Sequence, residues 1–332
     1  MHSRHLVVRV LSTAAVVAAV GLPVSLVNLP SAVAAKVYKG PDVASYQHPH
    51  PTKAHPHGQP INWTKVKKSG KSFAIVKATE GTSYVNPYFA GPYANDYADS
   101  LAAGLVHGSY HFARPATPIV ASAKAQAALF AKTIGPVTTA DTLPPALDLE
   151  VTGGLNRGQL VTWALDFLLD MRSLTGRTPM LYTYPSFWTN DLGDPTALAR
   201  YPLWMAEFGV RRAPVSDLWQ YTSTAHISGI DGDVDISKFV GTSGFPWSTL
   251  SNGTVATPWK ATAPAPPVGV HTSVAGTSAT ISWMPGDAGT SPVTSYQVTA
   301  SPGNQVVTVG GTSLSATFTG LSTSTSYTFT VT

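Results

Sequence analysis

Short apolar runs alternate with helix-period patterns through the first two thirds of the chain. The runs have the length of buried strands and occupy residues 73–77, 105–112, 146–150, 180–183, 203–206 and 218–221. Apolar residues recur at helical spacing over residues 120–134 and 160–174, where Gly135-Pro136 and Gly176 follow as stop signals. Strands that alternate with helices predict a mainly parallel sheet.

The later runs lie closer together than the earlier ones. Between Ala206 and Leu218 there is no room for a helix that would return the chain to the next parallel strand. The pattern therefore predicts an α/β fold, an irregular β/α barrel that is regular in its first half and helix-poor in its second.

The pattern changes again in the last quarter of the chain. Residues 241–267 are rich in Thr, Ser, Pro and Gly, which is typical of an extended linker. Beyond them, short strands of alternating character, such as residues 279–283 and 295–299, predict a small β-sandwich. We predict a barrel domain over residues 36–247, a linker over 248–266 and a second domain over 267–332.

The first 35 residues have the pattern of an export signal. A basic start is followed by an uncharged stretch over residues 10–35, and Ala32-Val33-Ala34 offers a cleavage site. A retained membrane anchor is the alternative, because the stretch is long enough to span a bilayer. Pro23 and Pro30 interrupt it and favour cleavage, so we expect a secreted protein, extracellular or associated with the cell wall.

Composition excludes several kinds of site and partner. Of the 332 residues, 43% are hydrophobic and 11% are charged, as in a globular protein with a large core. Cysteine is absent, which excludes disulfides, a thiolate nucleophile and cysteine metal sites. Loss of Arg4 and Arg9 with the signal would lower the net charge from +4 to +2. No basic cluster is interleaved with aromatic residues, so we expect no nucleic-acid partner.

Polar residues follow the apolar runs at five points, where the strands of the predicted barrel would end. They are Lys77, Glu80, Tyr110, His111, Asp148, Glu150, Glu207, Gln220 and Tyr221. Barrel enzymes carry their chemistry at the C-terminal ends of the strands. The repeated coincidence predicts a site at that end.

Asp148 and Glu150 form the most informative of these groups. If residues 146–150 are a strand, side chains two positions apart project from the same face. Two acids held that close raise one pKa, so that a neutral acid stands beside an ionised one, as glycoside hydrolysis requires. Taken alone, the tripeptide 148–150 more often marks a solvated acidic turn.

A histidine-proline segment, residues 48–60, is the other unusual feature. Short histidine-rich tracts bind metals in some proteins, but four prolines favour an extended surface insertion here, with no ordered carboxylate partner. We predict neither a metal site nor a cofactor.

Seven blocks of sequence resemble the glycoside hydrolase family 25 lysozymes, the Chalaropsis-type N-acetylmuramidases. In the family's order they are residues 42–47, 73–81, 108–112, 147–150, 203–206, 218–222 and 232–235. Two positions depart from the family's usual pattern. Asn62 stands where an Asp usually precedes the tryptophan of the first helix, and Phe208 stands where tyrosine is common.

The resemblance implies a barrel of five β/α units followed by strands without helices. It also implies hydrolysis of the β-1,4 bond between N-acetylmuramic acid and N-acetylglucosamine in bacterial peptidoglycan. By motif position Glu150 matches the general acid and Asp148 its partner carboxylate, while Asp42 and Asp235 match the other two acids of the cleft. Asp148 would act as nucleophile, as electrostatic stabiliser, or by orienting a substrate acetamido group. Crowding by ionised Asp148 would keep Glu150 protonated.

Further residues are expected to bind substrate. First and last strands of a closed barrel are neighbours, so Asp42 and Asp235 can approach the same site. The substrate-binding set is Tyr110, Lys77, Glu80, Tyr182, Trp204, Glu207, Gln220 and Tyr221, whose aromatic members would pack on sugar rings. Trp163 and Trp219 are expected in the core instead. A protein that binds cell walls without hydrolysis is the alternative function.

The last residues resemble a fibronectin type III domain, with Trp283 as core tryptophan and Tyr327 as corner tyrosine. The sequence stops at the sixth strand, so we expect a truncated or incomplete module. Contact with cell-wall polysaccharide or protein is one expectation for it.

Overall fold

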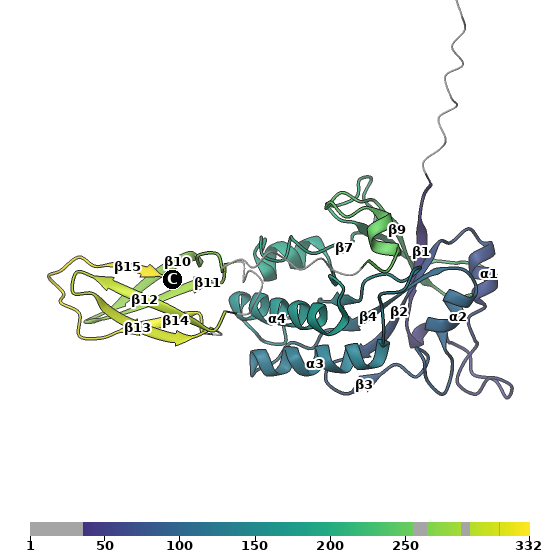
Figure 1. Ribbon diagram of the computed structural model, residues 1–332, viewed down its shortest axis with the longest axis horizontal. Coiled ribbons are helices and arrows are strands. Elements are labelled where there is room, and N and C mark those ends of the chain that lie inside the picture. Colours follow the sequence, from purple (N-terminus) through teal and green to yellow (C-terminus); the bar gives the residue numbers. More distant parts are fainter. Residues whose placement is uncertain (1–35, 255–263, 287–292, 312) are drawn as a thin grey trace, which may run out of the picture. The chain divides into compact units, whose positions relative to one another are not determined.

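The computed structural model describes residues 36–254, 264–286, 293–311 and 313–332 (Figure 1). The predicted signal peptide and the middle of the predicted linker lie outside the described residues. Within the described ranges, no helix is long and apolar enough to cross a membrane.

Eight strands close into a barrel. In chain order they are β1 (Lys39–Val43), β2 (Phe73–Glu80), β4 (Val106–Phe112), β5 (Ala146–Asp148), β6 (Met180–Thr183), β7 (Leu203–Ala206), β8 (Leu218–Ala225) and β9 (Val234–Phe239). Neighbours from β2 to β8 pair in parallel, whereas β9 runs antiparallel to both β8 and β1. β1 closes the barrel by pairing with both β2 and β9. The short β3 (Tyr84–Val85) forms a hairpin with the end of β2.

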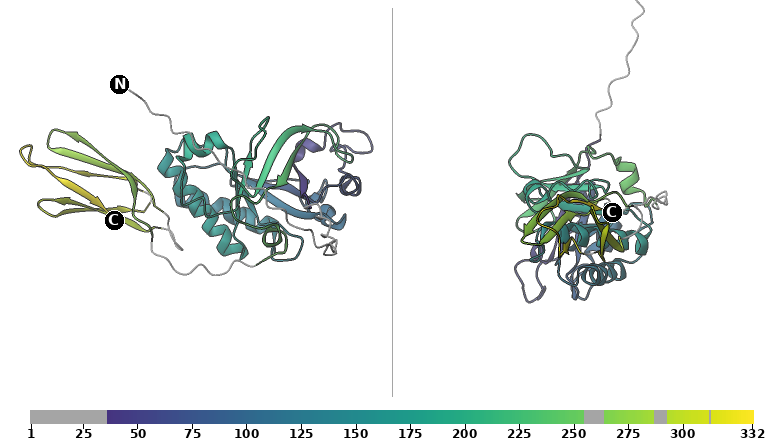
Figure 2. Two further views of the ribbon diagram at one scale, coloured as in Figure 1. Left: turned by 90° about the horizontal axis from the view of Figure 1, so that it is seen from above. Right: turned by 90° about the vertical axis from the view of Figure 1, so that its left-hand side faces the viewer.

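The helices follow the first five barrel strands. They are α1 (Trp63–Lys68), α2 (Asp96–Ala102), α3 (Ile119–Ile134), α4 (Arg157–Thr175) and the short α5 (Pro185–Phe187), which continues into the π-helical turn η2 (Trp188–Leu192). A 3-10 turn, η1 (Ser45–Gln47), comes before α1, and α6 (Trp247–Ser251) comes after β9. The helices lie on the outside of the sheet (Figure 1 and Figure 2). The predicted barrel with five β/α units and a helix-poor second half is confirmed.

Local signals explain where the longest helix begins and ends. The side chain of Asn156 caps α4 by accepting from the backbone N–H of Gln159, whose side chain accepts in return from the N–H of Asn156. Gly176 ends the helix with φ +68°, a conformation that glycine adopts without strain. The predicted range 160–174 missed the first turn, because only the capping residues mark it.

Strand β5 is shorter than predicted and ends at Asp148. The buried Leu149 donates its backbone N–H to the carbonyl of Tyr182, and Glu150 is the second residue beyond the end of the strand. Asp148 and Glu150 are therefore neighbours at a strand end, and not two positions along one regular strand.

Strand alternation divides the core into two clusters. Side chains that point inward, among them Phe73, Ile75 and Trp204, fill the barrel, while outward-pointing residues such as Val76 and Leu147 pack beneath the helices. Leu250 of α6 is buried in the inner cluster. The compact domain therefore continues beyond residue 248, where the predicted linker begins.

The C-terminal domain has two three-stranded sheets. β10 (Val268–Ala275), β11 (Ser278–Met284) and β14 (Ser315–Phe318) form one, and β13 (Gln305–Gly310), β12 (Ser295–Ser301) and β15 (Thr328–Val331) form the other. Trp283 lies buried between them, as predicted. The hydroxyl of Tyr327 accepts from the backbone N–H of Ser322, the contact expected of a corner tyrosine.

A buried cation ties the N-terminal ends of the barrel strands to α6. Arg177 is 1% exposed, and burial lowers its pKa to about 10. Its guanidinium donates to the carbonyls of Val137 (2.6 Å), Thr142 (3.1 Å) and Leu250 (3.0 Å). Three carbonyls thus depend on one side chain for their hydrogen bonds.

We predict that Arg177→Met lowers the free energy of unfolding by about 3 kcal/mol, because methionine leaves three buried acceptors without a donor. Urea unfolding followed by fluorescence measures the change, and Arg212→Met at an exposed position is the matched control. Equal midpoints for the two variants would contradict this role.

Candidate active site

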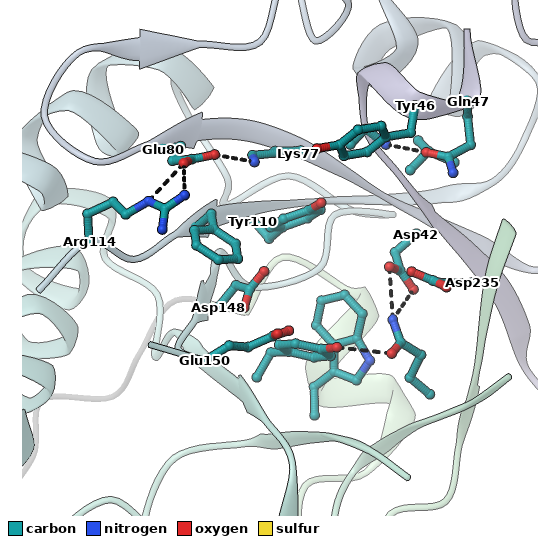
Figure 3. A pocket seen from close by; sticks show the side chains of 16 residues that line it. Asp42, Tyr46, Gln47, Lys77, Glu80, Tyr110, Arg114, Asp148, Glu150 and Asp235 are labelled. Carbon is teal, nitrogen blue, oxygen red and sulfur yellow. Dashed lines mark hydrogen bonds and ion pairs between the residues drawn. The ribbon is translucent and has the colours of Figure 1, made fainter. Parts of the chain in front are cut away.

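A cavity of about 280 Å³ opens at the C-terminal ends of the barrel strands (Figure 3). Its lining residues are Asp42, Val43, Ala44, Tyr46, Gln47, Lys77, Glu80, Tyr110, Phe112, Arg114, Asp148, Glu150, Tyr182, Trp204, Gln220 and Asp235. The structure thus brings together the four acids and six of the eight residues predicted to bind substrate.

Asp148 and Glu150 face the cavity from the end of β5. Asp148 is 6% exposed, and no described residue forms a hydrogen bond with its Oδ1 atom. Burial raises the pKa of Asp148 well above its ordinary value, and the charge of Glu150 raises it further. Burial also raises the pKa of Glu150, which is only partly buried, but the neighbouring Tyr182 hydroxyl and Asp148 carboxyl limit that rise.

The sequence led us to expect an ionised Asp148 beside a protonated Glu150. Asp148 lies deeper than Glu150, and burial raises the pKa of both groups. Which of the two carries the proton stays a prediction. Because both pKa values are raised by burial, the pair keeps a proton to a higher pH than an exposed carboxyl group would, and the two carboxyl groups share it. Glu150 is the member of the pair that faces the open part of the cavity.

Asp42 and Asp235 form a second pair of acids on the opposite wall. They lie directly across from one another on the antiparallel strands β1 and β9, so first and last strands are neighbours as expected. Burial raises the pKa of Asp42 well above its ordinary value, and Asp235 raises it further. Burial raises the pKa of Asp235 to about 6. Like charges at opposed positions repel, which also favours one proton for this pair.

Gln220 holds the second pair and connects it to the first. Its Nε2 donates to both carboxylate oxygens of Asp42 at 3.0 Å, while its Oε1 accepts from the hydroxyl of Tyr182 at 3.0 Å. Because carboxylate oxygens only accept, the amide directs Nε2 at Asp42 and leaves Oε1 for the hydroxyl of Tyr182. Gln220 thus joins Asp42 to Tyr182.

Aromatic side chains form much of the rest of the cavity. The buried Trp204 donates its indole N–H to Ser237 Oγ at 2.9 Å and packs edge-on against Tyr182 and Tyr110. Tyr46, on η1, is 83% exposed at the rim. Sugar rings bind to surfaces of this kind, because their C–H faces pack on aromatic rings.

Sequence reasoning missed six cavity residues, namely Val43, Ala44, Tyr46, Gln47, Phe112 and Arg114. Tyr46 and Gln47 lie in the first block of the resemblance, and Phe112 follows Tyr110 by two positions, so strand alternation could have found it. Arg114 lies in the loop after β4, and no sequence pattern pointed to it.

Three strand-end residues lie elsewhere. His111 points outward beneath α3, where burial lowers its pKa to about 4, so it is a neutral core residue. Glu207 and Tyr221 do not line the cavity. Tyr221 packs beside Trp219 and faces Lys39 and Lys238. Substrate binding by Glu207 and Tyr221 stays a prediction.

The histidine-proline segment differs from the expected surface insertion at one residue. His48 is buried, contacts the carboxylate of Asp96 at 2.8 Å and stacks on Tyr88 at 4.0 Å between ring centres. The expected lack of a carboxylate partner was therefore wrong. Across the described residues, no three His, Asp or Glu side chains are grouped to hold a metal ion.

Asp235→Asn is predicted to stabilise the protein above pH 7. The carboxyl's folded pKa of about 6 lies above its ordinary 3.8, so its contribution to stability is full below pH 3.8 and is lost as pH rises through 6. Asparagine does not ionise, so the variant does not lose this stability as pH rises. We expect a gain of about 1–2 kcal/mol at pH 8, after allowance for partial exposure, and none below pH 4.

Urea unfolding at pH 3.8, 6 and 8 measures this difference. Asp231→Asn at an exposed position is the matched control and should show no trend with pH. A variant that is less stable than wild type at pH 8 would contradict the raised pKa of Asp235.

A β/α barrel that gathers paired carboxyl groups and aromatic side chains at the C-terminal ends of its strands has the architecture of a glycoside hydrolase. The model of the family described as glycosyl hydrolases family 25 matches residues 54–230, more than half of the chain, and the protein belongs to this family. The fibronectin type III domain model matches residues 264–332. Both resemblances seen in the sequence are confirmed.

Known relatives agree with this assignment. Lysozyme M1 of Streptomyces globisporus is 38% identical over 195 residues, which cover 54% of this chain and 64% of that protein. N,O-diacetylmuramidase of Chalaropsis sp is 33% identical over 61% of this chain and 99% of that protein. The crystal structure of the bacterial lysozyme from Streptomyces coelicolor covers 66% of this chain and all of that chain, with 34% identity and a TM-score of 0.56.

Proposed function

We propose that the protein is a secreted muramidase that hydrolyses the β-1,4 bond between N-acetylmuramic acid and N-acetylglucosamine in bacterial peptidoglycan. The observation that carries the proposal is the cavity in which two carboxyl pairs, each with one buried member, face each other in a family 25 barrel. Relatives named lysozyme and N,O-diacetylmuramidase support the substrate class.

In this mechanism the pair formed by Asp148 and Glu150 supplies the proton. Glu150 gives the shared proton to the glycosidic oxygen as the bond from the anomeric carbon breaks. Both carboxyl groups of the pair are then negative, and their charge stabilises the oxocarbenium-like centre. Water adds to the anomeric carbon and returns a proton to the pair. Asp42 and Asp235, oriented by Gln220, supply further negative charge on the opposite wall.

Substitution of the acid tests the proposal. Glu150→Gln keeps the shape of the side chain but cannot give up a proton in this way, so we expect reducing-sugar release from purified bacterial walls to fall by about 10²–10⁴-fold. Asp231→Asn, outside the cavity, is the matched control. An inactive wild type, or an unchanged rate in Glu150→Gln, would refute the assignment.

A protein that binds walls without hydrolysis remains the second candidate, and it predicts that wild type pellets with walls but releases no sugar. The four acids in the cavity favour hydrolysis.

Export is part of the proposal. The basic start, the uncharged stretch and Ala32-Val33-Ala34 support a cleaved signal over residues 1–35, followed by the catalytic domain, a linker and the fibronectin type III domain. We predict that N-terminal sequencing of the exported protein reads from Ala35 or Lys36. A protein that retains Met1 and stays with the membrane would favour the anchor instead.

A further inference from the structure

The charges that line the cavity are not evenly spread. Five lining residues are acids and two, Lys77 and Arg114, are cations. The two cations lie together with Glu80 at one edge, away from Asp42 and Asp235 (Figure 3). A neutral sugar alone gives no reason for this local excess of positive charge.

Glu80 accepts from both cations and balances only one of them. Its Oε2 lies 2.5 Å from Lys77 Nζ, and its Oε1 accepts from Arg114 Nε at 2.8 Å and Nη2 at 2.5 Å. Burial raises the pKa of Glu80, but the two cations outweigh it, so the pKa is lowered overall. The cluster therefore holds two positive charges and one negative charge near neutral pH.

Phe112 lies against both cations. Lys77 Nζ is 5.0 Å and the Arg114 guanidinium carbon 4.7 Å from the centre of its ring. Contact with the same aromatic ring limits the directions in which the two side chains can move. The positive charges are thus held at the cavity edge.

The backbone of Arg114 is fixed from α3. Gln126, which is 1% exposed, accepts from the N–H of Arg114 at 3.0 Å and donates to its carbonyl at 2.6 Å. The same Gln126 Oε1 accepts from Nε2 of neutral His111, which ties the loop to β4. Gly81 gives the arginine room, because a Cβ there would lie 3.3 Å from Arg114 Cγ.

The guanidinium keeps donors for a ligand. Its contacts with Glu80 use Nε and Nη2, no described residue accepts from Nη1, and the side chain is 55% exposed. Lys77 is 13% exposed and also lowers the pKa of Asp148, so it acts on the catalytic pair as well. Arg114 is therefore the residue at which anion binding can be separated from catalysis.

We propose that Arg114, with Lys77, forms a subsite that binds a carboxylate carried by the glycan next to the scissile bond. The inference rests on the proposed function and specifies its substrate: the ligand is the lactyl arm of a muramic acid residue, with the carboxylate either on the free arm or on a peptide attached to it. A guanidinium with an open edge suits this planar anion better than a neutral hydroxyl.

The test compares Arg114→Gln, Arg114→Lys and the exposed-site control Arg212→Gln on three soluble glycans. One has free lactyl carboxylates, one has the same arms as methylamides, and one carries stem peptides. For Arg114→Gln we expect KM on the free-carboxylate glycan to rise about tenfold, equivalent to about 1.4 kcal/mol, with kcat within twofold. Arg114→Lys should recover part of the loss, and Arg212→Gln should match wild type.

On the methylamide glycan Arg114→Gln should equal wild type. A KM effect on the stem-peptide glycan that disappears when the peptide carboxylates are amidated assigns the anion to the peptide, and an effect confined to the free arm assigns it to the lactyl group. Equal losses on the carboxylate and methylamide glycans, or no loss on any glycan, would overturn the subsite.

Calorimetry in a Glu150→Gln background separates this inference from the proposed function. We expect the free-carboxylate glycan to bind about tenfold more weakly when Arg114→Gln is added, and the methylamide glycan to be unaffected. This result supports the subsite even if wild type hydrolyses no glycan. Absence of hydrolysis would refute only the proposed muramidase activity. Equal affinity of both glycans for the protein with Arg114 would refute the subsite while leaving hydrolysis intact.

Discussion

Four of the five acids that line one small cavity, namely Asp42, Asp148, Glu150 and Asp235, are the constraint on which the rest of the site depends. Burial raises the pKa of each of them, and neighbouring acids raise the pKa of Asp42, Asp148 and Asp235 further, so the cavity keeps protons to a higher pH than four exposed acids would. This arrangement costs stability above pH 6, and the fold offsets it locally. Gln220 donates to Asp42, and Lys77 lowers the pKa of Asp148. The same burial keeps the proton that the proposed glycoside cleavage needs.

Closure of the barrel is what brings the acids together. Asp42 and Asp235 are almost two hundred positions apart in sequence, yet the antiparallel pairing of β1 with β9 sets them opposite each other. The Asp148 pair comes from the end of β5 on the other side of the barrel. Helices are absent after β7 and β8, and the chain instead turns back as the β8–β9 hairpin. The irregular half of the barrel thus provides Asp235, and the regular half provides Asp148.

Periodicity predicted the barrel well because its signals are local. Residues 203–206 and 180–183 match their strands, since apolar runs bounded by turns leave few alternatives. Strand ends likewise pointed to Lys77, Asp148 and Gln220. Contacts between distant segments could not be found in this way. The burial of His48 depends on Asp96, and the position of Arg114 depends on Gln126 of α3. Which member of the Asp148 pair lies deeper is likewise set by the fold, because burial does not appear in a spacing of two residues.

The centre of the cavity and its Glu80 edge favour opposite charges on the substrate. At the centre, the carboxyl pairs favour a group that becomes positive as the bond breaks, and a fixed anion there would be repelled. At the Glu80 edge, two cations share one acid, so an anion is favoured. A neutral glycan chain suits the centre of the cavity but offers no anion to the Glu80 edge. A glycan with an acidic arm on alternate sugars suits both places when its register puts one arm at Arg114. With the proposed subsite occupied by the acidic arm, electrostatics would select the register of the chain in the cavity, and with it the bond that lies at Glu150.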